Sequence, residues 1–165
     1  SDVCSSDLLA GELFKALASV DIVHVAYKGA GPALSALLSG EMQMMVTDAA
    51  NVTGHVRAGR VRALAVTSAQ PTALVPGLPA VAADLPGYEA VGVTGIWAPA
   101  GTPQAAINRL NAEILRYLGR TEVRDTFFAR GADVVGATPA QLASFLKSDI
   151  DNMGRVIREA GIRAD

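Results

Sequence analysis

The sequence predicts an α/β protein with a mainly parallel sheet, and three observations lead to this fold class. Three largely apolar segments are predicted to be strands: the β-branched residues 22–27, and residues 42–46 and 61–66. Helical patterns lie between them at 33–38 and 49–57, and each ends at a glycine, Gly40 or Gly59. Alternation of strands and helices implies parallel strands joined by right-handed crossovers. The last strand is apolar at nearly every position, which is typical of a strand buried on both faces.

The elements outside this core are predicted to be mainly helical. Leu9–Leu17 has apolar residues at helical spacing before the first strand. Residues 71–87 are rich in proline and glycine and leave room for a short helix at most, and residues 90–98 form an extended segment. Thr102-Pro103 then supplies a cap and a first-turn proline for a helix. Its apolar face consists of Ile107, Leu110, Ile114 and Leu118.

Two further helices complete the second half of the chain. Thr121–Ala129 predicts a short helix, with three apolar side chains facing inward: Val123, Phe127 and Phe128. Thr138-Pro139-Ala140-Gln141 is a capping box, which starts a long helix. The apolar stripe of that helix consists of Leu142, Phe145, Leu146, Ile150, Met153 and Ile157.

The composition excludes several classes of function. The chain has 165 residues, is 50% hydrophobic and has a net charge of −2 with acids and bases interspersed, which argues against nucleic-acid binding. No apolar run is long enough for a membrane-spanning helix. One cysteine (Cys4) and two histidines (His24 and His55) match no metal-site pattern, and we expect neither a metal nor a cofactor. No nucleophile, phosphate-loop or dinucleotide motif is present, so we do not expect an enzyme.

Residues 1–8 differ from the rest of the chain. The stretch Ser-Asp-Val-Cys-Ser-Ser-Asp-Leu shows neither a strand nor a helix period, and it resembles translated sequencing-adapter read-through. We therefore expect these residues to be a non-native artefact and Cys4 to have no functional role. The absence of an initiator Met and of a signal peptide predicts that the sequence is a fragment.

The turn at residues 27–33 is the principal candidate for a binding site. A strand is predicted to run into a turn containing Gly29 and Gly31, and Pro32 then opens a helix. Free backbone N–H groups and the macrodipole favour an anion at such a helix start, and a carboxylate is expected because no phosphate loop is present. A tight strand-to-helix turn without a ligand is the alternative. The candidate residues of the turn are Tyr27, Lys28, Gly29, Ala30, Gly31, Pro32 and Ala33.

Two more candidates follow the other predicted strands. In a parallel sheet the carboxyl ends of the strands share one edge, so Asp48 and Thr67 would lie near the turn. Asp48 is interpreted either as an acceptor for a ligand hydroxyl, amine or bridging water, or as the side-chain cap of the next helix. Lys28 adds charge to the site or is simply solvated. Tyr27 lines the cleft or packs at the strand end.

Several motifs in a fixed order resemble a known family. They are residues 24–34, 38–41, 56–67 and 98–103, which read HVAYKGAGPAL, LSGE, VRAGRVRALAVT and APAGTP. In this order of motifs the chain resembles the solute-binding proteins of tripartite tricarboxylate transporters, the Bug family. The resemblance extends from about Leu9 to the C-terminus. Ala26 stands where a proline is common, and Gln70-Pro71 replaces a usual basic residue.

The resemblance implies a periplasmic receptor of the type II periplasmic-binding-protein fold, which delivers a small organic acid to membrane permease subunits. It implies that residues 9–91 are the second, ligand-binding lobe and that residues 92–165 are the crossover and the C-terminal helices of the first lobe. In the family the ligand contacts of this lobe come from the turn at Tyr27–Ala33 and from Asp48. The alternative is the ligand-sensing domain of a transcription regulator with a similar fold.

Overall fold

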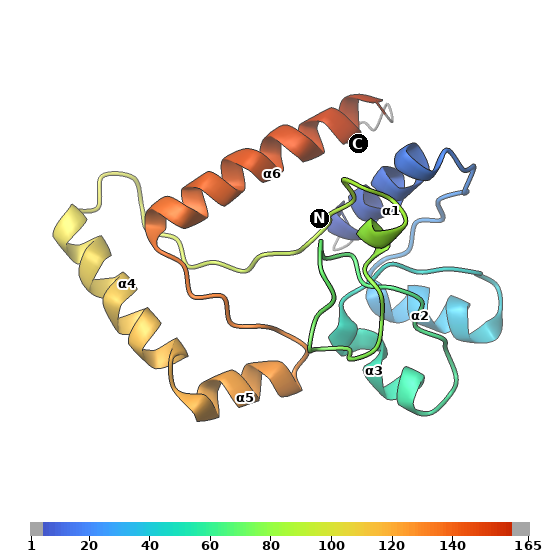
Figure 1. The fold of residues 1–165 in the computed structure, drawn as a ribbon, viewed down its shortest axis with the longest axis horizontal. Helices are drawn as coiled ribbons and strands as arrows, with labels where there is room; N and C mark the ends of the chain where they lie inside the picture. The colour runs from blue at the N-terminus through green and yellow to red at the C-terminus, as the bar shows by residue number, and fades with distance from the viewer. Residues whose placement is uncertain (1–4, 160–165) are drawn as a thin grey trace. The chain divides into compact units, whose positions relative to one another are not determined.

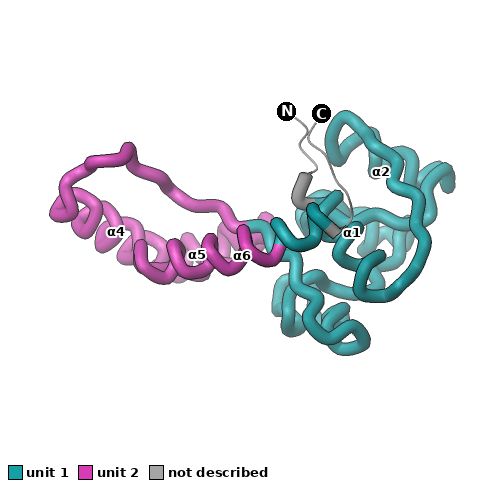
Figure 2. The backbone as a smooth tube through the Cα atoms, turned by 90° about the horizontal axis from the view of Figure 1, so that it is seen from above, with its two compact units in different colours: residues 1–92, 153–165 teal, residues 93–152 magenta. Residues whose placement is uncertain are grey.

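The computed structural model describes residues 5–159, and their secondary structure is helical (Figure 1). The helices are α1 Ser5–Ala18, α2 Ala30–Ser39, α3 Ala49–Arg57, the 3-10 helix η1 Val81–Ala83, α4 Gln104–Leu118, α5 Thr121–Ala129 and α6 Pro139–Glu159. The chain divides into two compact units (Figure 2). Unit 1 contains residues 1–92 and 153–165, and unit 2 contains residues 93–152.

The predicted parallel sheet is not confirmed. Residues 22–27, 42–46 and 61–66 form no strand, and the one bridge within the described part of the chain joins Val66 to Ala80 in parallel. A strand needs backbone partners on a neighbouring segment, and β-branched composition alone does not supply them. The expectation that residues 61–66 are buried on both faces is wrong, since the side chain of Leu64 is 65% exposed.

Three helices end in the same glycine turn. In α2 the N–H of Gly40 donates to the Leu37 carbonyl and the N–H of Glu41 to the Ala36 carbonyl, at 3.2 and 3.0 Å. Gly40 has φ +80°, which is a left-handed conformation that favours glycine. The same pair of bonds closes α3 at Gly59, and the expectation that these two glycines stop the helices is confirmed. Gly131 closes α5 in the same way.

Of the two predicted caps at helix starts, the structure confirms the one at α6 and not the one at α4. At α6 the predicted capping box is present: the N–H of Gln141 donates to Thr138 Oγ1 at 3.2 Å, and the N–H of Thr138 donates to Gln141 Oε1 at 2.9 Å. The predicted cap of α4 is wrong. The hydroxyl of Thr102 donates back to the Pro99 carbonyl at 2.8 Å, so it is used in the preceding turn rather than in the helix.

The apolar faces in unit 2 are only partly buried. On α5 the side chain of Val123 is buried, as expected, but Phe127 and Phe128 are exposed. On α4 the face is half-buried apart from Leu110, whose side chain is 54% exposed. Helical periodicity identifies which side chains share a face, but burial also requires a second element packed against that face.

A buried tyrosine joins α1 to the segment after η1. Tyr88 is 2% exposed, and its hydroxyl donates to the Ala10 carbonyl at 3.1 Å. Its ring meets the Phe14 ring edge to face, with the centroids 6.3 Å apart. Because α1 begins at Ser5, the expectation that residues 5–8 lack helical structure is wrong. Residues 1–4 lie outside the described residues, and the artefact hypothesis stays a prediction.

We expect Tyr88 to dominate the stability of unit 1. Tyr88→Phe removes the hydrogen bond to the Ala10 carbonyl, which keeps its helical partner, and should lower the free energy of unfolding by about 0.5–1.5 kcal/mol. Tyr88→Ala also removes the buried ring and should cost about 3–5 kcal/mol. Tyr117→Phe is the matched control, because that side chain is 53% exposed. Urea unfolding followed by circular dichroism measures all three, and equal losses in the two Phe variants would contradict the assignment.

The ionisation of Tyr88 should also appear in the pH dependence of stability. Burial raises the pKa of the Tyr88 phenol above its ordinary value of 10.0. The folded chain therefore retains the neutral phenol more strongly than the unfolded chain. Its contribution is complete below pH 10 and is lost as the pH rises through the raised folded-state pKa. Alkaline urea titrations should show this loss in the wild type and not in Tyr88→Phe.

One glycine within α3 and one in the turn that closes it should respond to alanine in opposite directions. Gly59→Ala places a side chain at φ +67° and should lower the free energy of unfolding by about 1–2 kcal/mol. Gly54→Ala lies inside the helix with open space around the new Cβ, and it should raise that free energy by about 0.5–1 kcal/mol. Thermal and urea unfolding check both. A shift of the same sign in both variants would contradict the cap at Gly59.

Candidate functional site

The turn before α2 has the geometry that the sequence predicts for close approach of a ligand. Gly29 has φ +103° and ψ 171°, and its N–H donates to the Tyr27 carbonyl at 2.9 Å. A Cβ built at Gly29 or at Gly31 meets no atom within 4 Å. The backbone therefore faces open space on the side where side chains are absent. At Gly29 the positive φ also disfavours any residue with a side chain.

The first turn of α2 offers two backbone donors. The N–H groups of Ala30 and Gly31 have no hydrogen-bond partner among the described residues. Pro32 follows them and has no N–H group, and the N–H of Ala33 takes part in the helix's own hydrogen bonding. The helix α2 begins at Ala30, three residues earlier than expected. Ala33 is buried and holds the turn against unit 1, whereas Gly31 and Pro32 are exposed. The partial positive charge of a helix start adds to these donors.

The two side chains before the glycine differ in environment. Tyr27 is half-buried and Lys28 is exposed. Within residues 5–159 no ion pair engages the Lys28 ammonium group. A lysine so placed can supply positive charge near the turn.

Asp48 does not cap α3 with its side chain. It occupies the N-cap position with φ −60° and ψ 139°, but its carboxylate makes no capping hydrogen bond, and the residue is exposed. The amide of Asn51 donates to the hydroxyl of Thr47 instead, at 3.0 Å. The capping interpretation is therefore wrong in this structure, and the Asp48 carboxylate is available to another group.

Thr67 is half-buried, and its carbonyl accepts the N–H of Ala90 at 2.9 Å. The structure does not join the three predicted parts of the site directly. Among the described residues, no hydrogen bond or ion pair connects the turn at 27–33, Asp48 and Thr67 with one another. The helices α2 and α3, which follow the first two parts, do pack against each other.

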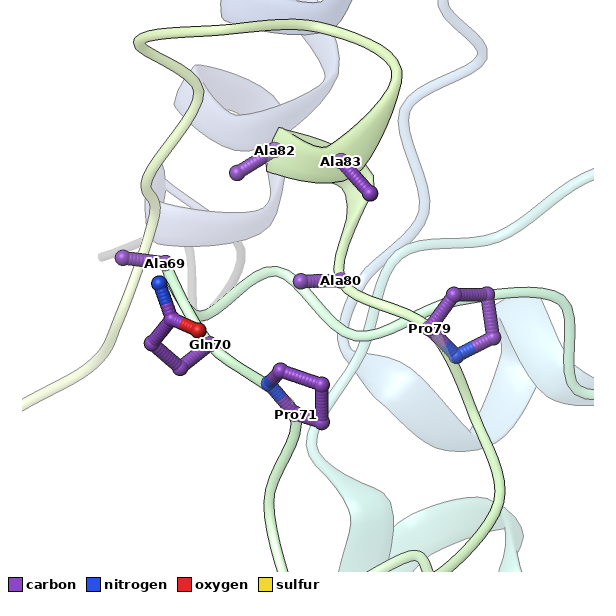
Figure 3. Close-up of a pocket in the computed structure, with 7 residues that line it drawn as sticks. All are labelled: Ala69, Gln70, Pro71, Pro79, Ala80, Ala82 and Ala83. Atoms are coloured by element: carbon purple, nitrogen blue, oxygen red, sulfur yellow. The ribbon is translucent and has the colours of Figure 1, made fainter.

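Sequence reasoning missed a shallow cavity beyond Thr67. It has a volume of about 260 Å³, and Figure 3 shows its lining of prolines, alanines and one amide: Ala69, Gln70, Pro71, Pro79, Ala80, Ala82 and Ala83. The proline-rich composition of this stretch was its only signal. The lining residues include no charged side chain, so this cavity does not suit a carboxylate.

Ligand chemistry other than anion binding has little support in the described residues. Nowhere in residues 5–159 do three His, Cys, Asp or Glu side chains gather as a metal site would require. No helix within that range has both the length and the apolar character needed to cross a membrane. Nδ1 of His55 is buried without a hydrogen-bond partner, but it stands alone within α3.

Comparison with known proteins gives a consistent result. The sequence pattern of the "Tripartite tricarboxylate transporter family receptor" matches residues 2–162. The chain is 36% identical over 159 residues to the "UPF0065 protein in tcbD-tcbE intergenic region" of Pseudomonas sp. strain P51. That match covers 95% of this chain and 47% of the relative, so the chain spans about half of the relative's length.

Two solved structures share the fold. "R. palustris Rpa4515 with adipate" has a TM-score of 0.77 and 31% identity, and the match covers 95% of this chain and 53% of that one. The "periplasmic binding protein BugD" has a TM-score of 0.76 and 28% identity, with 96% and 54% covered. Neither structure nor the Pseudomonas relative is described as a transcription regulator. The chain belongs to the tripartite tricarboxylate transporter receptor family, as its ordered motifs predicted.

Proposed function

We propose that this chain is part of an extracytoplasmic receptor that captures a small organic acid and delivers it to the membrane subunits of a tripartite tricarboxylate transporter. The observation that carries the proposal is the pair of unpartnered N–H donors at Ala30 and Gly31, beside a Gly29 with open space. Such a group suits an anion without any catalytic side chain. The chain thus acts by binding rather than by catalysis.

The ligand class follows from the donor set and from the relatives. Backbone N–H groups can donate to either a carboxylate or a phosphate, but the solved relative from R. palustris is described with adipate, a dicarboxylate. We propose that one carboxylate lies on the α2 turn, with Lys28 adding charge. Asp48 then interacts with a ligand hydroxyl or with a bridging water, because its carboxylate repels a second anion.

The position of the chain in the receptor is also a proposal. We infer that residues 9–91 make up the second lobe and that residues 92–165 cross to the first lobe, in a periplasmic protein whose fold is of type II. The likeness to periplasmic BugD supports this assignment. The first boundary between the compact units falls between Gly92 and Val93, whereas residues 153–165 belong with unit 1.

The affinity of this chain alone should be weak. Charge-assisted hydrogen bonds contribute about 1.5–3 kcal/mol each, and micromolar binding requires about −8 kcal/mol after the cost of association. Two donors from one turn therefore give a site in the millimolar range. Calorimetric titration with adipate should detect no micromolar binding to the 165-residue chain, and micromolar binding would contradict the view that a second lobe is needed.

Blocking the α2 turn should abolish this weak binding. Gly31→Leu fits the backbone but places a side chain beside the free N–H groups, and we expect the adipate-dependent shifts of the amides at positions 30 and 31 to disappear. Titration of the amide NMR signals measures this directly. Gly54→Leu, also at an open helical site, is the matched control and should keep the shifts. Loss in both variants, or retention in both, would contradict the assignment.

A further inference from the structure

Three exposed arginines lie at the end of α3 and in the residues that follow it. Arg57 is the last residue of the helix, Arg60 follows the turn at Gly59, and Arg62 lies in the extended segment beyond. Within the described part of the chain, no hydrogen bond or ion pair engages their guanidinium groups. Residues 49–83 contain no Asp or Glu, so no sequence neighbour neutralises this charge, although the whole chain carries −2.

The backbone beneath these arginines is well defined. The N–H of Gly59 donates to the Val56 carbonyl at 3.0 Å, and the N–H of Arg60 donates to the His55 carbonyl at 2.9 Å. These two bonds fix the direction in which the chain leaves α3. A partner that binds the arginines therefore has to immobilise side chains but not the backbone, which lowers the entropic cost of association.

Stabilisation of α3 accounts for only one of the three arginines. A cation in the last turn interacts favourably with the negative end of the helix dipole, and Arg57 and His55 occupy that turn. This effect falls off within one turn of the helix end. Arg60 and Arg62 lie beyond the helix, so their presence calls for another role.

The arginines lie at the opposite end of α3 from the candidate ligand site. Asp48 precedes the helix and Arg57 ends it, and a helix of nine residues spans roughly 14 Å. A partner bound at the arginines therefore leaves Asp48 free to interact with a ligand.

We propose that Arg57, Arg60 and Arg62 form a docking surface for an acidic extracytoplasmic surface of the transporter's membrane subunits. This inference rests on the proposed function. Guanidinium groups bind carboxylates through paired hydrogen bonds, and arginine is enriched at protein interfaces. An anionic membrane is a poorer partner, because three basic residues supply only about 3 kcal/mol there and the net charge of −2 opposes it.

The test measures binding of the full chain to membrane subunits reconstituted in phosphatidylcholine nanodiscs, by surface plasmon resonance at low and high salt. The triple variant Arg57→Gln, Arg60→Gln and Arg62→Gln should associate about tenfold more slowly and depend less on salt. The control variant Arg109→Gln, Arg124→Gln and Lys147→Gln changes the net charge equally at exposed sites of unit 2. It should bind like the unmodified chain.

Three results would overturn the docking surface. They are unchanged association of the first triple variant, equal slowing in the control variant, and arginine-dependent binding to empty phosphatidylglycerol nanodiscs. If circular dichroism shows that the glutamine variant unfolds, the corresponding triple lysine variant keeps the charge and should retain most of the association rate. NMR titration with adipate is run in parallel. If adipate shifts no amide signal of the unmodified chain, the proposed function is refuted. If adipate binds but the arginines do not affect docking, only this surface is refuted.

Discussion

The hydrogen bond from the Tyr88 hydroxyl to the Ala10 carbonyl is the interaction on which unit 1 depends. It joins residues separated by 78 positions in the sequence, and Tyr88 is the largest fully buried side chain among the described residues. The other buried apolar residues of this unit are small: Ala10, Ala33, Ala36, Ala80 and Val156. Because alanines bury little apolar surface, one ring and one hydroxyl carry a large share of the packing energy.

The candidate site depends on how α2 is held within this unit. Ala33 and Ala36 bury one face of the helix, and the turn at Gly40 closes its far end. The opposite side of the first turn is left exposed, with its N–H groups unpartnered. A helix start usually obtains these bonds from a capping side chain, but Gly29 has none to offer. The same glycine that permits the turn therefore leaves the N–H groups of Ala30 and Gly31 free.

Opposite charges lie at the two ends of α3. Asp48 stands at the start with a carboxylate that caps nothing, and the arginines stand at the end without acidic partners. Unpaired exposed charges contribute little to folding stability, because water solvates them well. Folding stability therefore does not account for their arrangement, and the proposed ligand site and docking surface give these charges a role.

Local chemistry explains what could be predicted from the sequence. Gly40 and Gly59 end their helices and Thr138 pairs with Gln141, because each of these motifs forms hydrogen bonds within a few residues. The order of motifs also identified the family. The strands were predicted less well, because β-branched residues favour an extended backbone but a ladder needs a neighbour that no local pattern supplies.

Where the sequence allowed more than one local arrangement, only the tertiary structure decided between them. The sequence allowed Asp48 to cap α3 or to interact with a ligand, and in the fold its carboxylate makes no capping hydrogen bond. It placed Phe127 and Phe128 on an inward face that remains exposed, and it gave no sign that Tyr88 would be the central buried residue. Burial depends on what packs against a side chain, and that partner lies far away in the sequence: for Tyr88 it is α1.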